Sequence, residues 1–582
     1  MNKRAVVGGL AVIALALAGC TGVPTSSAPE TVGRVDVESA TSTPPIVPAA
    51  NADPRAIVSG FLSSNSIDPK NHTSARAFLA PATQRSWSDQ TATILDTTDI
   101  GTYPVGRASV TILVRGRIIG SLNAAGVYTP SLRGNGANGG GQADTVSYPF
   151  VLRKVAGHWR IAGLRPGLLL NLAQFQGFYK ERPLYFLDLA AQSLVPDARF
   201  TALDGADLDS WLVNQLAAGP RPELRNAVLS DTAPARAAAR SVTVDAQHPA
   251  VVEIPGSSQL NAEAKRELAA QVSKTLDAAA PDERIQITDS GTPVRIPDLG
   301  GTSFTASDFS EYGGPPLPDN EVYYLRNGRI VDQNGKYLTG PLNRGLYLLK
   351  SVALSRQGPD ALLTVAAETP AGLVVGNETT GFGSVVLSGL SSSRPAWAPG
   401  LSEVWISKGS KIFRLTVSNK TASAAQVSIP SLTGGGEITA LRLSPEGSRI
   451  AIVIRAGGGA HLFIGSIVRT AGQVRIDALQ SISPDGVAIN DVAWIGELKL
   501  FAIGTNNPDG VGETFETNAD GSFWTANPLG PLPHTPDSVT GATQQIAWVS
   551  VDSTVWVQVG RSWRLAGDSP RQTDGDKPVY LE

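Results

Sequence analysis

The stretch Arg442-Leu443-Ser444-Pro445-Glu446-Gly447 joins a short apolar strand to a turn, and similar stretches recur through residues 321–582. Because proline fixes φ and glycine tolerates a positive φ, residues 444–447 are predicted to form a hairpin turn. Five segments repeat the strand pattern: 352–355, 396–399, 442–445, 492–495 and 546–549. Their anchors, Leu354, Trp397, Leu443, Trp494 and Trp548, are 43, 46, 51 and 54 residues apart.

Repeats of this length predict an all-β propeller over residues 321–582. One four-stranded blade exposes both faces until its neighbours pack on it, so such blades occur in rings with periods of about 40–50 residues. The five repeats favour five blades, with the strand Val322–Leu325 joining the last one, and six blades are the alternative. The turn Ser483-Pro484-Asp485-Gly486 is out of phase with the anchors and is predicted to link two blades.

The first 20 residues are predicted to be an export signal. Two cations, Lys3 and Arg4, precede an apolar run from Ala5 to Gly19 that is too short to cross a membrane. The run ends in Leu17-Ala18-Gly19-Cys20, which holds the one cysteine of the chain. Small residues before a cleavage point let the chain lie extended in a peptidase, and a thiol is a nucleophile that can accept a lipid.

Residues 17–20 resemble the lipobox of bacterial lipoproteins. The resemblance implies removal of a signal peptide at 1–19, a diacylglycerol thioether on Cys20, and N-acylation of its new amino group, for example by palmitate. Leu17, Ala18 and Gly19 would be the recognition residues. Two or more acyl chains give durable anchoring, so we expect a lipid-anchored protein on the extracytoplasmic face of the cell membrane. Residues 20–50 are rich in Pro, Thr and Ser and are predicted to be a disordered tether.

An α+β domain is predicted over residues 51–170. Asp53-Pro54 is typical of a helix start, with aspartate as the cap and proline at the first helical position. A second short helical stretch is expected to hold Phe78 and Leu79, and strands are expected at 108–120, 145–155 and 157–164. This order of helices and antiparallel strands resembles the NTF2-like arrangement.

A second α+β domain is predicted over residues 181–296. Asp207 is expected to cap a helix that ends at Gly219-Pro220, and strands are expected at Leu184–Leu187 and Ile285–Ile287. The segments 185–187, 216–220, 251–254 and 271–276 resemble the GerMN domain of sporulation and germination proteins, which implies a protein-interaction module. Residues 297–320 are rich in Gly and Pro and are predicted to be a linker.

Composition and motifs argue against several classes of function. The net charge is −3 and no long basic run occurs, so no nucleic-acid partner is expected. A single cysteine excludes an intrachain disulfide and a cysteine-rich zinc site. The Gly134–Gly139 segment formally matches a dinucleotide motif but has no helix after it, so a hairpin loop is the better interpretation.

Two acidic clusters and the histidines were weighed as metal or catalytic sites. Asp204, Asp207 and Asp209, or Asn506, Asp509 and Glu513, could bind calcium, but neither set has EF-hand spacing, and helix capping or a solvated turn is favoured. The five histidines are scattered along the chain; they are His72, His158, His248, His461 and His534. No recognised nucleophile motif occurs, so the sequence predicts no catalytic residue, no metal, no cofactor and no enzymatic activity.

The lipobox, the GerMN-like domain and the C-terminal propeller occur in the order found in the LpqB family of actinobacterial lipoproteins. That resemblance implies an accessory of the MtrA–MtrB two-component system, which binds the extracytoplasmic part of the sensor histidine kinase MtrB and influences cell-envelope homeostasis. Two alternatives remain open: an envelope receptor whose propeller channel binds a cell-wall glycan or peptide, and a propeller hydrolase or lyase.

Overall fold

A computed structural model describes residues 45–102, 108–131, 145–229, 244–245, 249–314, 321–357, 361–430, 435–470, 472–506, 511–542, 544–567 and 575–581. The contacts between residues divide the chain into two units, Met1–Pro45 and Ile46–Glu582. Leu17, Ala18, Gly19 and Cys20 lie outside the described residues, as does the glycine-rich 134–141 segment. No described helix combines the length and the apolar character that a membrane crossing requires.

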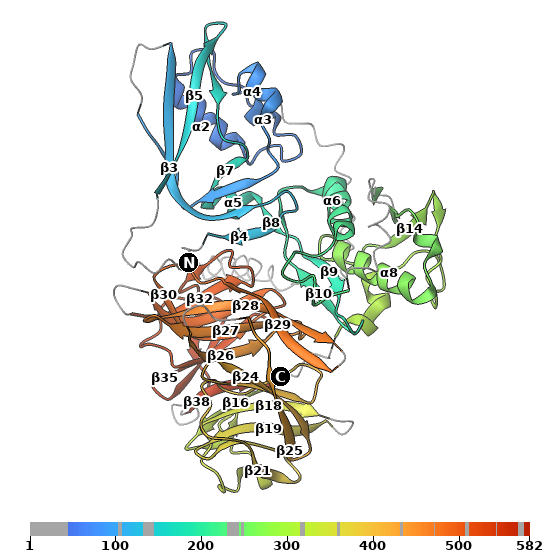
Figure 1. Cartoon of the computed structure of the whole chain (residues 1–582), viewed down its shortest axis with the longest axis vertical. Coiled ribbons are helices and arrows are strands. Elements are labelled where there is room, and N and C mark those ends of the chain that lie inside the picture. The colour runs from blue at the N-terminus through green and yellow to red at the C-terminus, as the bar shows by residue number, and fades with distance from the viewer. Residues whose placement is uncertain are drawn as a thin grey trace, which may run out of the picture. The chain divides into compact units, whose positions relative to one another are not determined.

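The N-terminal domain packs short helices against one sheet, as expected of an α+β fold (Figure 1). In α2 (Pro54–Ser64), the Asp53 side chain accepts a hydrogen bond from Ala56 N at 2.8 Å, which confirms the predicted cap. The sheet has the strand order β6-β5-β3-β1-β7, with β2 and β4 paired to β3. Its elements are β1 (Ala92–Leu95), β2 (Asp99–Ile100), β3 (Ser109–Leu122), β4 (Tyr128–Pro130), β5 (Thr145–Val155), β6 (His158–Gly163), β7 (Leu168–Asn171), α3 (Thr73–Arg76), α4 (Pro81–Ser86) and α5 (Leu172–Phe178).

Phe78 and Leu79 are not helical, so that expectation was wrong. Helix α3 ends at Arg76, and Leu79 instead forms a bridge to Ile161 of β6. Ala80 precedes Pro81, and a residue before proline is driven out of the helical region, so Ala80 is extended before α4. Both side chains are buried in the core of this domain. The sequence therefore predicts two apolar residues correctly and their secondary structure wrongly.

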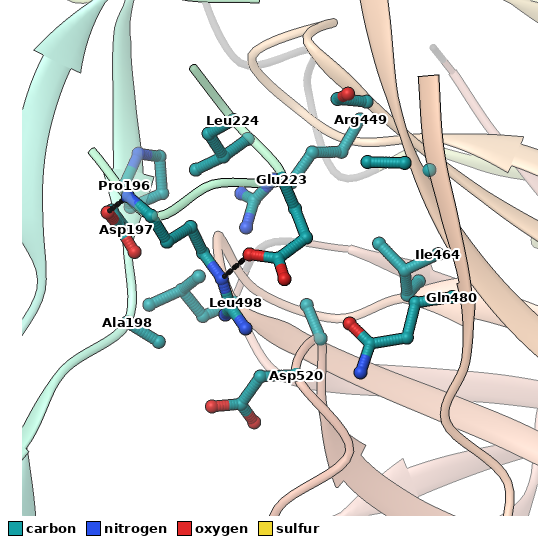
Figure 2. A pocket seen from close by; sticks show the side chains of 15 residues that line it. Pro196, Asp197, Ala198, Glu223, Leu224, Arg449, Ile464, Gln480, Leu498 and Asp520 are labelled. Carbon is teal, nitrogen blue, oxygen red and sulfur yellow. Dashed lines mark hydrogen bonds and ion pairs between the residues drawn. The ribbon is translucent and has the colours of Figure 1, made fainter. Parts of the chain in front are cut away.

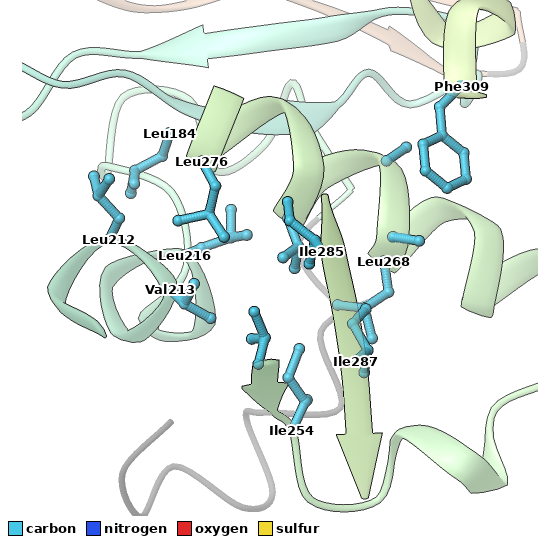
Figure 3. Close-up of a cluster of buried hydrophobic side chains, with 14 of the residues drawn as sticks. Leu184, Leu212, Val213, Leu216, Ile254, Leu268, Leu276, Ile285, Ile287 and Phe309 are labelled. Carbon is cyan, nitrogen blue, oxygen red and sulfur yellow. The ribbon is translucent and has the colours of Figure 1, made fainter. Parts of the chain in front are cut away.

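The second domain has a core between two helices and a small sheet. Figure 3 shows Leu212 and Leu216 of α6 (Gly205–Ala218) facing Leu276 of α8 (Ala262–Asp277), with Ile285 and Ile287 of β14 beside them. The sheet order is β12-β13-β14-β15, and β13 and β14 run parallel, joined through α8. The strands are β8 (Lys180–Glu181), β9 (Leu184–Leu187), β10 (Leu194–Asp197), β11 (Phe200–Thr201), β12 (Val244–Asp245), β13 (Ala250–Glu253), β14 (Ile285–Asp289) and β15 (Thr292–Pro293), with η1 at Ser257–Gln259.

Asp207 does not cap α6, contrary to expectation. The cap position belongs to Asp204, and Asp207 lies in the first turn, where it accepts a hydrogen bond from Lys70 Nζ at 2.6 Å. The predicted end of the helix is confirmed, because Gly219 has a φ of 96°, a conformation that favours glycine.

Residues assigned to a linker by composition contribute to the core of the second domain. Phe304, Phe309 and Tyr312 are buried in the same cluster as α6 and α8, and Phe304 bridges to Ile285. A short 3₁₀ helix, η2 (Ala306–Tyr312), holds two of these rings in place. Glycine and proline at the ends of the segment are typical of a linker, so composition alone does not reveal these buried aromatic residues.

The C-terminal region consists of antiparallel sheets in chain order. Its described residues form five four-stranded sheets and one three-stranded sheet with the order β17-β16-β38. The four-stranded sheets are β18–β21 (Ser351–Gln357, Leu362–Thr369, Gly372–Asn377, Gly381–Ser388), β22–β25 (Ala396–Trp397, Glu403–Lys408, Lys411–Ser418, Thr421–Val427), β26–β29 (Glu437–Leu443, Arg449–Ala456, Gly459–Thr470, Gln473–Ser481), β30–β33 (Val487–Trp494, Lys499–Asn506, Val511–Asn518, Thr525–Ala526) and β34–β37 (Ser538–Ala542, Ile546–Val551, Thr554–Val559, Ser562–Leu565).

The first and last strands of this region share a sheet. β16 (Val322–Arg326) pairs with the C-terminal β38 (Asp576–Tyr580) and with β17 (Arg329–Asp332), whereas the sequence placed it in the sheet of the last repeat. β38 also contacts both β34 and β18, so it lies between the last and the first of the four-stranded sheets.

Four of the five sequence anchors lie in the first strand of a sheet, and Trp548 lies one strand later, in β35. Trp397 Nε1 donates to Ala353 O of the preceding sheet at 3.1 Å, and Trp494 Nε1 repeats this bond to Arg442 O at 3.2 Å. These two tryptophan anchors therefore tie neighbouring sheets together and also fill the space between them. The 444–447 turn joins β26 to β27, and the 483–486 turn links two sheets, as predicted.

Arg394, in the connection before β22, reaches three other sheets. Its guanidinium group pairs with Asp491 of β30 and donates to Val539 O of β34 at 2.7 Å and to Pro578 O of β38 at 3.2 Å. Asp491 is also within 3.6 Å of Arg442 and is buried. One buried cation thus satisfies backbone carbonyls and a carboxylate that come from different repeats.

We expect Arg394→Met to destabilise the C-terminal region by about 3–5 kcal/mol, because it removes the charge that compensates a buried carboxylate. Differential scanning calorimetry of the full chain measures the loss as a lower transition temperature.

Arg356→Met is the matched control, since Arg356 pairs with Glu321 where both side chains are more than a third exposed. A surface pair of this kind contributes less than about 1 kcal/mol. Equal effects of the two substitutions would contradict the role given to Arg394.

Candidate functional site

An aromatic contact joins the C-terminal region to the other two domains. Phe523, in the turn between β32 and β33, lies with its ring centroid 5.0 Å from that of Phe175 in α5 and 5.4 Å from that of Phe200 in β11. Tyr128 of β4 stacks on the other side of this cluster, 5.7 Å from Phe175. All three domains therefore meet at one apolar cluster, and packing of this kind stabilises a contact beyond its buried area.

Charged side chains are buried next to the aromatic cluster. Arg199 Nη2 and the backbone N of Arg221 both donate to Asp197 Oδ2, at 2.7 and 2.8 Å. Asp520, from the same turn as Phe523, is 5% exposed, and its Oδ2 has no hydrogen-bond partner among the described residues. Burial raises the pKa of Asp520, with Arg221 acting in the opposite direction. Burial alone would lower the pKa of Arg221. The negative charges of Asp197 and Asp520 outweigh the effect of burial and raise the pKa of Arg221.

These groups surround a small cavity between the second domain and the C-terminal region. Figure 2 shows Asp197 and Glu223 on one side of it, and Asp520 and Gln480 on the other. The cavity volume is about 40 Å³. A buried water needs at least about 10–15 Å³, so this space suits a few waters that complete the hydrogen bonds of Asp197 and Asp520 rather than a substrate.

Glu181 of β8 belongs to the same charged group. Burial, together with the negative charge of Asp520, raises the pKa of Glu181 to about 8, although Lys499 and Arg449 act in the opposite direction. Its Oε1 is shielded from solvent and has no partner in the part of the chain that the structure describes. The junction therefore favours a neutral Glu181.

Direct hydrogen bonds complete the contact between the second domain and the C-terminal region. Tyr185 Oη donates to Glu497 Oε2 at 2.7 Å, and Asn226 Nδ2 donates to Asp477 Oδ2 at 3.2 Å. Burial and the Glu497 carboxylate raise the pKa of Tyr185, so the phenol stays protonated and remains a donor.

A larger cleft lies between the N-terminal domain and α6. Its volume is about 350 Å³, and His72, Asp89, Tyr179 and Trp211 are among its lining residues. His72 Nδ1 lies 3.3 Å from Asp89 Oδ2, and that carboxylate also accepts a hydrogen bond from Arg76 at 2.6 Å.

The titrating groups of the cleft have shifted pKa values. Burial lowers the pKa of His72, although Asp89 acts in the opposite direction, so the imidazole is neutral near pH 7. Burial alone would raise the pKa of Asp89. The hydrogen bond from Arg76 outweighs the effect of burial and lowers the pKa of Asp89. Burial and Asp89 raise the pKa of Tyr179 to about 12.

The structure does not bring the histidines together. His72 lines the cleft, His158 bonds to Ala50 O, His461 lies 3.4 Å from Ser483 Oγ, and His534 pairs with Asp552. His248 lies outside the described residues.

The acidic clusters weighed as calcium sites do not form a described metal site. Within the described ranges, no group of three or more His, Cys, Asp or Glu side chains is placed to hold a metal ion. Glu513 accepts a hydrogen bond from Asn527, and Asp509 lies outside the described residues.

Sequence reasoning did not find the junction residues. Asp520-Gly521 follows β32 and resembles any hairpin turn, and Glu181 and Arg221 are separated from it by about 300 residues of sequence. The one usable signal was Phe523, a large apolar side chain placed within a turn.

Three family models match the chain in succession. They are the lipoprotein LpqB N-terminal domain at residues 47–176, a sporulation and spore germination domain at 183–295, and the lipoprotein LpqB beta-propeller domain at 328–580. These matches confirm the predicted class: an N-terminal domain, a GerMN-type domain and a β-propeller domain.

Curated relatives match over most of the chain. Lipoprotein LpqB of Mycobacterium paratuberculosis is 30% identical over 80% of this chain and 80% of its own length, and that of Mycolicibacterium smegmatis is 29% identical over 75% and 76%. Among solved structures, a chain of a nidogen/laminin complex matches with a TM-score of 0.33 and 8% identity over 45% of this chain and 97% of its own. The agreement with the relatives across all three domains shows that this chain belongs to the LpqB lipoprotein family.

Proposed function

We propose that this chain is a lipid-anchored accessory of a sensor histidine kinase on the extracytoplasmic face of the cell membrane. Membership of a lipoprotein family supports the anchor, and Leu17-Ala18-Gly19-Cys20 gives the site at which the lipid would attach. Acylation of Cys20 would hold the protein at the membrane, and residues 21–45 would set its distance from the lipid. No catalytic residue, metal or cofactor enters this role.

The proposed partner is the extracytoplasmic part of a kinase like MtrB, which the resemblance to the LpqB family implies. The observation that carries the proposal is the junction around Phe523 and Asp520, which ties the three domains into one compact unit. A unit in which three domains are in contact offers a combined surface on which a membrane protein could dock.

A lipid anchor would also make binding to a membrane partner more favourable. Two proteins confined to one membrane meet at a raised effective concentration, so a weak contact suffices for occupancy. A bound accessory then shifts the kinase between its conformations only as far as it binds one of them more tightly.

No observation on the described residues favours the alternative of a ligand in the propeller channel. Arg394 extends from one sheet to three others and pairs there with Asp491. We therefore keep the interaction role as the proposal.

Cys20→Ala should release the protein from the membrane into the soluble fraction and reduce signalling through the response regulator. In the proposal Cys20 carries both the thioether-linked lipid and the N-acyl chain, so its replacement removes every acyl chain that would hold the protein at the bilayer. Immunoblots of membrane and soluble fractions measure the distribution, and the phosphorylation level of the regulator measures the output.

Ser26→Ala, a change within the same tether, should leave both readouts unchanged. Membrane retention of the Cys20→Ala chain with full signalling would contradict the anchoring proposal.

Residues 46–582 should bind the purified extracytoplasmic domain of the kinase with a Kd in the micromolar range, which corresponds to about −8 kcal/mol. Isothermal titration calorimetry measures this binding directly, with the cytoplasmic kinase domain as the negative control. An absence of heat at partner concentrations far above that range would contradict the partner assignment.

The stability of the compact unit should fall as pH rises from about 5 to 9. The folded state raises the pKa of Glu181 from its ordinary value to about 8. The folded chain therefore binds more protons than the unfolded chain in this window. The stabilisation is complete below the ordinary carboxyl pKa of about 4.3 and is lost as pH rises through about 8.

Glu181→Gln should remove much of this slope and raise the melting temperature at pH 9 by about 2–4 °C, while changing little at pH 5. Glu263→Gln, at an exposed carboxylate, is the control and should keep the original slope. A wild-type melting temperature that rises between pH 5 and 9 would contradict a buried, neutral Glu181.

A further inference from the structure

The cleft between the N-terminal domain and α6 has the size of a small-ligand site, and the proposed docking role leaves it unused. Its volume of about 350 Å³ exceeds that of the junction cavity several-fold. Pockets for small molecules begin near 300 Å³ and occur preferentially between domains.

Three aromatic side chains are among the lining residues of the cleft. Trp211 of α6 is half-buried and lines the cleft together with Phe200 and Tyr179. Gly126 allows the indole to lie close to the N-terminal domain, because a Cβ at that residue would stand 2.9 Å from Trp211 Cη2. Flat rings of this kind provide an apolar platform for a ligand that has one apolar face.

Other lining residues of the cleft offer neutral polar groups with spare hydrogen-bonding capacity. Asn123 Oδ1 accepts from Ala125 N and Val127 N, which leaves its Nδ2 as a donor. The Thr91 hydroxyl makes no hydrogen bond to any other described residue, and Gln90 uses only its Nε2, in a bond to Asp89. A ligand that carries several hydroxyl or amide groups would match these positions.

The charges at the cleft cancel in pairs. Lys70 pairs with Asp207 at 2.6 Å, and Arg76 pairs with Asp89 at 2.6 Å. His72 is buried and carries no charge near neutral pH. A cleft without net charge gives no electrostatic preference for an ion, so a neutral ligand fits best.

His72 supplies an independent sign that the site is incomplete without a ligand. Its backbone has a φ of 49°, an uncommon conformation for a residue other than glycine. Its side chain lines the cleft and is buried, and Nε2 has no hydrogen-bond partner within the described ranges. A buried nitrogen without a hydrogen bond is unfavourable, and a ligand or a water in the cleft would supply that bond.

We infer that this cleft binds a neutral saccharide unit, with one face of the sugar ring against Trp211 and its hydroxyl or acetamido groups on Gln90, Thr91 and Asn123. This binding is separate from docking to a kinase, and neither depends on the other. A sugar ring combines the apolar face and the ring of hydroxyls that these two sets of lining residues require.

The test uses residues 46–582, which form a compact unit without the preceding residues. The protein is labelled with fluorotryptophan, and N-acetylglucosamine is titrated to concentrations of about 10 mM, since single sugars bind near the millimolar range. We expect the fluorine resonance of Trp211 to shift saturably and that of Trp159 to stay unchanged, because Trp159 of β6 is half-buried but does not line the cleft. Trp211→Leu and Trp159→Leu assign the two resonances.

The same variants test the contacts, with saturation-transfer NMR of the sugar protons as the readout. Trp211→Leu should weaken binding about tenfold and Thr91→Val about threefold, whereas Trp159→Leu should leave it unchanged. Lys70→Gln should change the affinity by less than about twofold, because the ligand is neutral. Melting temperatures show that each variant is folded.

Four results would overturn the inference. They are the absence of any shift of the Trp211 resonance, equal effects of Trp211→Leu and Trp159→Leu, tighter binding of galacturonate than of the neutral sugar, and loss of binding in Lys70→Gln. The last two would assign an anionic ligand. Kinase binding measured on the same protein distinguishes failure here from failure of the docking proposal.

Discussion

The insertion of one turn between two other domains is the contact on which the arrangement of this protein depends. The turn after β32 brings Phe523 against Phe175 and Phe200, and it buries Asp520 beside Arg221. An aromatic contact provides a favourable burial energy, and a buried carboxylate is tolerated only where cations and donors compensate it. Together these contacts link the three domains within the unit Ile46–Glu582.

The junction contains buried charges where an apolar interface could also have formed. Replacing buried ion pairs by apolar groups is often neutral or stabilising, so their value lies elsewhere than in stability. Asp197 accepts two hydrogen bonds on one oxygen. The strength of a hydrogen bond depends on its direction, whereas that of an apolar contact to a leucine does not. We interpret this polarity as the source of a unique docking geometry.

The C-terminal region uses the same principle at its centre. Arg394 connects four sheets through one carboxylate and two backbone carbonyls, while Trp397 and Trp494 connect neighbouring sheets through single bonds to carbonyl oxygens. A propeller of irregular repeats lacks a strict motif to fix each interface, and these side-chain bonds to the backbone replace it. Of the two cavities described above, the cleft beside α6 is the larger.

The sequence alone determined what depends on local chemistry. The Asp53-Pro54 helix start, the Gly219 helix end and the 444–447 hairpin follow from backbone preferences of a few residues, and the spacing of Leu354, Trp397, Leu443 and Trp494 follows from the repeat. The Cys20 site likewise depends on a local motif, and it stays a prediction. Only the tertiary structure decided which distant groups meet. Asp520 with Glu181, and Trp211 with His72, come from separate domains, and no periodicity encodes a distance across a folded interface. The same limit explains the errors at Phe78 and Phe304, where burial against another element outweighed the local pattern. At Asp207 the error was the position of the helix start, which lies at Asp204.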